Sequence, residues 1–275
     1  MKGNIVMFIK ILYFLAMGLV SLTANVVTPS MSVGSEGATK VHVVEQKDLS
    51  SEIALTKEAF EKFAKGDQDV IAQFDRFCGL LQDGVKTGVL SITGAQDLLR
   101  ASLFAAEKHQ TQTQKNPQKT PYIIHPLDVA NRVMSIGGVY DVDVVVAALL
   151  HDTLEDTGAT YQEIADRFGP KVAGYVQELT DPKGVSMKER KKQQIIHAFH
   201  NSQGAAIIKM ADKMSNLTIL LKSPPSEWSR DRIDQYFQWA QAVIENLPES
   251  NTPLKKEVKQ VITQYWENQE AKQKQ

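Results

Sequence analysis

The chain has 275 residues, of which 43% are hydrophobic and 23% are charged, and its formal net charge is -1. These proportions are ordinary for a globular protein and exclude a wholly disordered chain. A nearly neutral chain lacks the basic excess that draws proteins to long nucleic acids, so any anionic ligand must be recognised locally. The length suits one sizeable catalytic domain with appendages.

Cys78 is the single cysteine, which excludes an intramolecular disulfide and any structural zinc site built from several cysteines. Its neighbours Phe74, Phe77, Leu80 and Leu81 are apolar. Such surroundings favour a buried structural thiol over a catalytic nucleophile.

Residues 1–30 have the pattern of a signal peptide or a membrane anchor, because lysines precede an apolar run at 11–20 and no further charge follows within this range. Ala24 could precede a cleavage site, but Leu22 is larger than the preferred residue there, so an uncleaved anchor stays open. We expect membrane contact through this segment and a domain that is exported (periplasmic or secreted) or anchored outside. The alternatives are a buried N-terminal helix and a cytoplasmic protein.

Residues 31–51 are rich in small, polar and charged residues and read as a linker. A helical extension is expected over 52–95, where apolar residues such as Val70, Phe74 and Leu81 recur at helical spacing, and a further helix over 98–109. Neither segment shows a convincing strand.

The later helices carry capping signals. Thr160 and Glu163 form a Thr-x-x-Glu capping box for a helix that stops near Gly169-Pro170, and Ser186 and Glu189 repeat the device. Further helices are expected over 204–221 and 228–246, and Thr252-Pro253 suits the cap and first position of a last helix. The predicted fold class is therefore all-α.

The segment 144–152 is an apolar helix that ends in His151 and Asp152. Neighbouring side chains lie about 100° apart around a helix, but their different reach lets both serve one ion. The alternative is a core histidine paired with a capping carboxylate.

Two more polar residues lie in apolar surroundings. His125 precedes Pro126, which sets the start of a helix, and Asp212 shares a helix face with Ile208 and Ile219. An unpaired carboxylate on such a face would be costly. An ion pair of Asp212 with Lys209 or Lys213 is possible, although we expect these lysines to point elsewhere on the helix.

Two imidazoles and two carboxylates suit manganese, iron or cobalt, and zinc is possible. A metal that activates water beside a phosphoryl group makes a phosphohydrolase the natural reaction class. Glu155 and Asp156 follow one helical turn after His151 and could orient or deprotonate the water. Their other interpretation is a solvated helix end.

At this point the sequence resembles the HD-type hydrolases, and within them the RelA/SpoT hydrolase domain, especially the stand-alone small alarmone hydrolases that include a metazoan form. The resemblance covers about residues 96–250. The matching motifs are Pro-Tyr-Ile-Ile-His-Pro at 121–126, Ala-Leu-Leu-His-Asp-Thr-Leu-Glu-Asp-Thr at 148–157, Glu-Arg-Lys at 189–191, and Ala-Asp-Lys at 211–213 with the Asn-Leu that follows at 216–217.

The resemblance implies an HD-domain helical bundle over 96–250 and hydrolysis of the 3′-pyrophosphate of ppGpp and pppGpp. The helix that begins at Thr252-Pro253 then forms a C-terminal segment over 251–275. The resemblance implies that four ligands hold one Mn²⁺ per chain, other divalent metals being possible. It also implies two catalytic acids, which act on the attacking water. The ligands are His125, His151, Asp152 and Asp212, and the acids are Glu155 and Asp156.

Four further residues match positions near the nucleotide. Lys115 and Arg232 would supply positive charge to phosphates, Asn216 would hydrogen-bond the nucleoside, and Tyr236 would pack against it. As structural alternatives, Lys115 is a loop cation, Asn216 and Arg232 are solvated helix residues, and Tyr236 is part of the core.

Two departures bear on the substrate. Gln114 replaces the family's arginine, which could stack on a base, and Met187 replaces a lysine of the nearest relatives. We expect hydrolysis without synthesis, because the chain after residue 250 is too short for another domain. The alternatives are an NADPH 2′-phosphatase, an activity also associated with the animal relatives, and a non-catalytic nucleotide-binding module. The sequence leaves the oligomeric state open.

Overall fold

The computed structural model describes residues 49–116 and 118–273. The predicted signal peptide or anchor at 1–30, and the predicted linker up to residue 48, lie outside these ranges. Helix α2 (Leu49–Ala64) begins at Leu49, so the last three residues assigned to the linker are helical instead. Within the described ranges, no helix combines the length and the apolar character that a bilayer crossing requires.

The predicted all-α fold class is confirmed: the described residues form helices and no strand, and their one β-type pairing is an isolated bridge between Thr113 and Pro121. The helices after α2 are α3 (Gln68–Lys86), α4 (Ile92–Lys108), α5 (Ile124–Ser135), α6 (Val142–Leu150), α7 (Thr153–Asp156), α8 (Tyr161–Phe168), α9 (Pro170–Leu179), α10 (Met187–His197), η1 (Ala198–His200), α11 (Gln203–Lys222), α12 (Arg230–Asn246) and α13 (Thr252–Gln273).

The helices of the N-terminal extension are joined by apolar packing. The Phe60 and Phe74 rings stack with their centroids 4.1 Å apart, which joins α2 to α3. Cys78 is buried on the same face of α3, so its predicted structural role agrees with its position. Burial raises the pKa of the Cys78 thiol to about 12, which keeps it protonated and unreactive at neutral pH.

The capping signals located two helix starts correctly. The Thr160 hydroxyl accepts a hydrogen bond from the Glu163 amide, and the Ser186 hydroxyl accepts one from the Glu189 amide. The predicted cap of the last helix is wrong by one residue, because the Asn251 side chain accepts from the Leu254 amide. Likewise α4 begins at Ile92 and not at Leu98, since Ser91 caps it.

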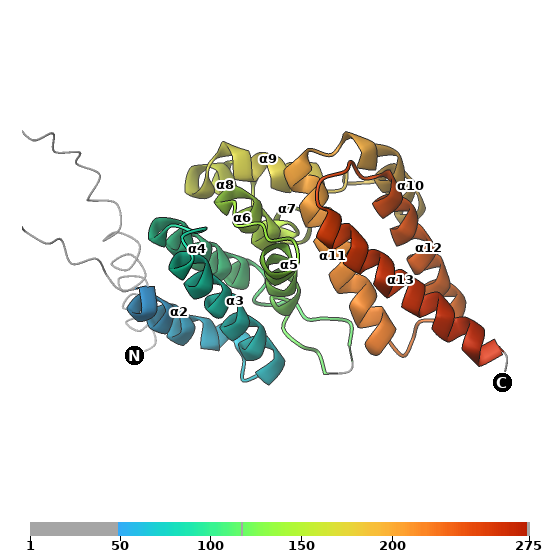
Figure 1. The fold of residues 1–275 in the computed structure, drawn as a ribbon, viewed down its shortest axis with the longest axis horizontal. Coiled ribbons are helices and arrows are strands. Elements are labelled where there is room, and N and C mark those ends of the chain that lie inside the picture. The colour runs from blue at the N-terminus through green and yellow to red at the C-terminus, as the bar shows by residue number, and fades with distance from the viewer. Residues whose placement is uncertain (1–48, 117, 274–275) are drawn as a thin grey trace, which may run out of the picture. The chain divides into compact units, whose positions relative to one another are not determined.

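Three helices position the polar residues singled out above. Helix α11 packs against α5, α6, α9, α12 and α13, and α13 runs beside α11 in the red and orange part of Figure 1. Helix α6 is buried at every position from Val144 to Leu150. The fold therefore carries His151, the residue after α6, into the interior.

Candidate metal centre

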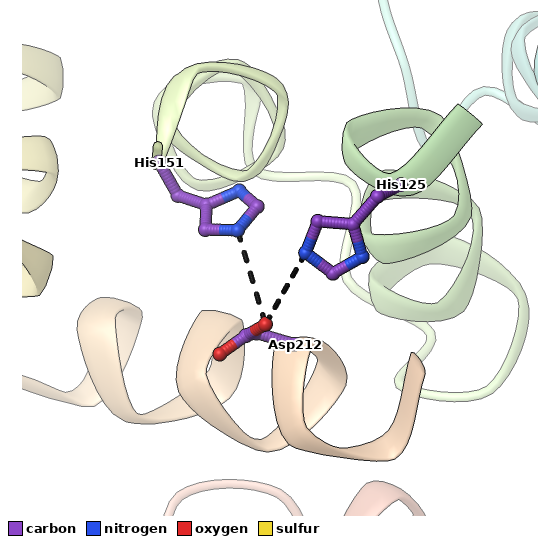
Figure 2. A group of neighbouring side chains, drawn as sticks. All are labelled: His125, His151 and Asp212. Atoms are coloured by element: carbon purple, nitrogen blue, oxygen red, sulfur yellow. Dashed lines mark ion pairs between the residues drawn. The ribbon is translucent and has the colours of Figure 1, made fainter. Parts of the chain in front are cut away.

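His125, His151 and Asp212 converge from three helices. His125 is in the first turn of α5, His151 follows the last residue of α6, and Asp212 projects from the middle of α11 (Figure 2). One ligand atom from each residue lies within 4.8 Å of the other two. Asp212 Oδ1 is 3.3 Å from His125 Nε2 and 3.9 Å from His151 Nε2.

Asp152 completes the group. Its Oδ2 atom lies 3.1 Å from His151 Nε2 and 3.7 Å from His125 Nε2. The Tyr122 hydroxyl donates a 2.6 Å hydrogen bond to the same oxygen. The four side chains that the sequence singles out as ligands are thus neighbours, although they lie up to 87 positions apart in the chain.

The two ring nitrogens of His151 have different surroundings. Nδ1 lies 2.9 Å from the Ala148 carbonyl oxygen, which can only accept, so Nδ1 carries the proton. Nε2 is buried and has no hydrogen-bond partner among the described residues. In the neutral ring Nε2 carries a lone electron pair that faces carboxylate oxygens. Because both sides are then electron-rich, a cation or a second proton is required between them.

The pKa values of His151 and Asp212 also indicate that the cluster favours a positive charge. Burial lowers the pKa of His151, but the Asp152 and Asp212 carboxylates raise it by more, to about 9. Burial raises the pKa of Asp212, while Lys213 and the two imidazoles bring it well below its usual range. The centre therefore concentrates negative charge that attracts any available cation.

The separations also fit one divalent ion. Nitrogen and oxygen ligands lie about 2.0 to 2.2 Å from such an ion, so neighbouring ligand atoms are roughly 3 to 4 Å apart. The distances from the carboxylate oxygens to the imidazole nitrogens, 3.1 to 3.9 Å, fall in this range. Together with the unpartnered His151 nitrogen, they show that these residues can hold a metal.

Residues 101–238 match the family model described as HD domain. The chain belongs to the HD-domain family. Membership of this family and the cluster of two histidines and an aspartate indicate that the HD domain binds a divalent metal.

The relatives define the branch of the family. The guanosine-3′,5′-bis(diphosphate) 3′-pyrophosphohydrolase MESH1 of Xenopus tropicalis is 48% identical over 157 residues, which cover 57% of this chain and 88% of that protein. The human protein of the same name is 43% identical, covering 62% of this chain and 95% of its own length.

A solved structure described as "A metazoan ortholog of SpoT hydrolyzes ppGpp and plays a role in starvation responses" is also similar. It has 39% sequence identity and a TM-score of 0.60, and the match covers 61% of this chain and 94% of that chain. The predicted membership of the RelA/SpoT-type small hydrolases is confirmed.

Lys213 corrects one expectation about the HD centre. Its ammonium nitrogen lies 2.9 Å from Asp212 Oδ2, although the helical positions suggested that it would point elsewhere. The long side chain reaches back to the adjacent residue, and it also packs over the Trp239 ring, 4.6 Å from the centroid. The local ion pair therefore exists beside the cluster, through the other carboxylate oxygen.

Glu155 and Asp156 lie on α7, at a pocket of about 130 Å³ beside the cluster. Glu155 accepts hydrogen bonds on both oxygens, from the Arg190 guanidinium at 2.8 Å and from the Asp181 amide at 3.2 Å. The Asp156 carboxylate accepts none from the described residues. Burial, as the largest cause, raises the pKa of both carboxyl groups. Glu155 is half-buried and Asp156 is exposed at the edge of the pocket, so both a role at the water and a partly solvated helix end fit their position.

The four residues matched to nucleotide contacts lie around the HD centre, outside that pocket. Asn216 donates a 2.6 Å hydrogen bond to Asp212 Oδ1, and Tyr236 packs between the Trp228 and Trp239 rings. The other two are cations. The Arg232 guanidinium stacks on Trp228 at 4.1 Å from the ring centroid, and Lys115 is exposed but close enough to Asp156 to lower its pKa.

Sequence reasoning missed several residues of the centre. Tyr122 bonds Asp152, the Ser215 hydroxyl lies 3.1 Å from His125 Nδ1, and Arg190 binds Glu155. The sequence suggests Lys209 only as an ion-pair partner of Asp212, yet Lys209 lines the pocket beside α7. Tyr122 and Arg190 stand inside the recognised motifs, which was the available signal, whereas Ser215 had none.

Proposed function

We propose that this chain hydrolyses the 3′-pyrophosphate of ppGpp and pppGpp, giving GDP and GTP with release of pyrophosphate. One water is consumed, its oxygen joins the phosphorus next to the ribose, and the bond from that phosphorus to O3′ breaks. The observation that carries the proposal is the convergence of His125, His151, Asp152 and Asp212 beside two acids. The named relatives, matched over most of their length, support the substrate.

The four converging side chains would hold one Mn²⁺ per chain through two imidazole nitrogens and carboxylate oxygens, a set that suits this ion and also iron or cobalt. When bound, the metal lowers the pKa of water and neutralises charge on a phosphoryl group. In the neutral His151 ring the free nitrogen is Nε2, because Nδ1 donates to the Ala148 carbonyl, so binding of the ion would displace only the Nε2 proton.

Asp156 is the better candidate for the base that removes a proton from the water. Its carboxylate is free of hydrogen bonds from the described residues, whereas both Glu155 oxygens are engaged by Arg190 and the Asp181 amide. Partial burial and the nearby Asp152 carboxylate raise its pKa above the ordinary aspartate value, which makes it a stronger base. Glu155, held in place by these bonds, would orient the water.

The nucleotide would lie outside the small pocket. Lys115 and Arg232 would meet phosphates, Tyr236 would pack on the nucleoside, and Asn216, whose amide nitrogen is bonded to Asp212, keeps its carbonyl oxygen for a nucleoside donor. Gln114 in place of a family arginine leaves the base choice open. The replacement at Gln114 therefore favours a second candidate activity, removal of the 2′-phosphate of NADPH, because that reaction needs the same activated water.

Export or anchoring through residues 1–30, and the domain limits at 52–95, 96–250 and 251–275, remain predictions from the sequence. Fractionation of cells that express the full-length protein tests the first. Recovery of the protein only with cytosolic markers would contradict export.

The activity is tested with purified full-length protein that has been stripped of metal and resupplied with Mn²⁺. We expect ppGpp to give GDP and pyrophosphate in equal amounts, and no product without metal. Parallel assays with NADPH distinguish the second candidate by its orthophosphate. Tight binding of either nucleotide without turnover in any metal would instead support a non-catalytic binding module.

Asp212→Asn provides the variant for this assay, because it keeps the shape of the side chain and removes the charge. We expect lost metal and a fall in rate of at least about 100-fold. Asp128→Asn is the control: Asp128 is also buried and ion-paired, with Arg132 at 2.7 Å, and it is not among the four proposed ligands. Full metal content in Asp212→Asn would remove Asp212 from the centre.

A further inference from the structure

Helix α11 carries two buried lysines one turn apart, and their surroundings differ. Lys209 and Lys213 are 7% and 5% exposed, and both line the pocket beside the metal centre. The Lys213 ammonium is paired with Asp212 at 2.9 Å. The Lys209 ammonium makes no hydrogen bond or ion pair with any described residue. A buried cation without a partner is costly, so this position calls for an explanation.

The acids nearest Lys209 are already bonded to other groups. Burial and the neighbouring Lys213 lower the pKa of Lys209 to about 8, so the ammonium is still mostly charged at neutral pH. The Asp212, Asp181 and Glu155 carboxylates oppose this shift. Glu155, however, accepts from Arg190 and from the Asp181 amide, and Asp181 accepts from the Gln194 side chain at 2.7 Å. The three donors of the ammonium therefore remain available to something that enters the pocket.

The pocket otherwise repels the phosphoryl groups that the proposed reaction requires. Five carboxylates line it: Asp152, Glu155, Asp156, Asp181 and Asp212. The charges of one divalent ion and of Lys213, which is already paired with Asp212, do not neutralise these five carboxylates. A polyanion that enters the pocket therefore needs one more positive group there.

The size of the pocket limits what can enter. Its volume of about 130 Å³ is well below the roughly 300 to 1,000 Å³ of sites that enclose a whole drug-sized ligand. It accommodates the phosphate end of a nucleotide and leaves the nucleoside outside, near Asn216 and Tyr236.

We infer that the Lys209 ammonium binds the phosphoryl oxygens of the group that is cleaved, in the substrate and in the released pyrophosphate. This inference rests on the proposed function and deepens it: the phosphoryl group would meet Lys209 in the pocket that His151, Asp152 and Asp212 also line. Lys209 is then a substrate-binding residue, whereas Lys213 serves Asp212.

Binding of inorganic pyrophosphate to full-length protein, in excess Mn²⁺ so that chelation is equal for all variants, tests this role. Lys209→Met keeps the length of the side chain and removes the charge. We expect about 10- to 100-fold weaker pyrophosphate binding by calorimetry, and weaker product inhibition, because a charge-assisted hydrogen bond is lost. Lys222→Met, at an exposed lysine of the same helix, should bind like the wild type.

Metal affinity, measured by competition with a metal-binding dye, separates binding from a purely structural role. It should be nearly unchanged in Lys209→Met, and Lys209→Arg should retain most of the pyrophosphate affinity. If Lys209→Met does not fold, Lys209→Gln replaces it under the same criterion. Unchanged pyrophosphate binding, or a loss fully explained by lost metal, would overturn the inference.

Orthophosphate is the second ligand in the same experiment. If Lys209→Met weakens the binding of orthophosphate and of pyrophosphate equally, Lys209 contacts a single phosphoryl group, which is all that a phosphate monoester offers. A larger effect on pyrophosphate places both groups there. Either result supports the role of Lys209.

The two proposals can fail separately. A wild-type protein that binds pyrophosphate through Lys209 but leaves ppGpp intact contradicts the proposed function alone. Hydrolysis of ppGpp by the wild type, with undiminished pyrophosphate binding in Lys209→Met, contradicts the role of Lys209 alone.

Discussion

His151 and His125 each use one ring nitrogen for the protein and turn the other toward Asp212. The Nδ1 atoms lie within hydrogen-bond distance of the Ala148 carbonyl and the Ser215 hydroxyl, respectively. These contacts fix the ring orientations before any ion arrives, so less ordering is needed on binding. The centre is thus organised by residues that would not touch the metal themselves.

Tyr122 acts in the same way on Asp152, and Tyr122→Phe tests it. Removing the hydroxyl removes the 2.6 Å hydrogen bond that orients the carboxylate, while the ring keeps its packing beside His109 and His125. We expect metal affinity to fall about 10-fold or more, measured by dye competition, with little change in the folded structure. Tyr161→Phe, at an exposed tyrosine, should have no effect, and unchanged affinity in Tyr122→Phe would show that the bond is not needed.

At the scale of residues, the sequence predicted which polar side chains are anomalous but not which partners they choose. His151 is anomalous because it directly follows an apolar helix, and Asp212 because it projects from an apolar helix face. Both residues lie in the cluster. The Lys213 pairing and the Tyr122 hydrogen bond depend on rotamers and on distant helices, which local spacing does not encode. The partners of a buried polar group therefore required the structure.

Helix α10 differs from the other helices around the site because it buries none of its residues. Ile195 is half-buried against the core, and the other contacts that attach α10 include several polar bonds. Arg190 binds Glu155, Gln194 binds Asp181, and the Trp239 indole donates to the Lys191 carbonyl at 3.0 Å. A helix held mainly by such bonds opens more easily than one with an apolar face, and here the bonds reach two acids of the pocket.

Arg190→Met should therefore loosen α10. Loss of the ion pair with Glu155, whose members are 34% and 28% exposed, should make amide hydrogens of α10 exchange about 3- to 10-fold faster. Hydrolysis should slow as well, because Glu155 loses one of the two groups that orient it. Lys192→Met removes an exposed charge from the same helix and should change neither quantity. Equal exchange rates in Arg190→Met and the wild type would show that the ion pair does not hold the helix.

At the scale of elements, the starts of α8 and α10 were predictable because their capping residues act within one turn. The start of α4 was not, since the Ser91 cap precedes a segment without an obvious apolar period. Whether a helix is buried, like α6, or attached by polar bonds, like α10, depends on what packs against it. That information is tertiary.

The helices outside the HD match belong to the same packed core. The match ends at residue 238, and α2, α3 and α13 lie beyond its limits. Even so, α3 packs against α5, which carries His125, and α13 packs against α11, which carries Asp212. The all-α class followed from the sequence, but this buttressing of the ligand-bearing helices from both ends of the chain could not be read from local patterns. It explains how three separate helices keep their ligands in register.

Because the metal would join α5, α11 and the end of α6, its removal should destabilise the whole unit. A ligand at about 100 times its dissociation constant stabilises the folded state by about 2.7 kcal/mol, which is about 5 to 10 °C in Tm for a unit of this size. Calorimetry of the full-length protein with Mn²⁺ and then with a chelator should show this shift. Asp212→Asn should melt at the same temperature in both conditions, since it lacks a ligand. An equal shift in that variant would place the stabilising metal elsewhere, and no shift in the wild type would contradict a metal that bridges the three helices.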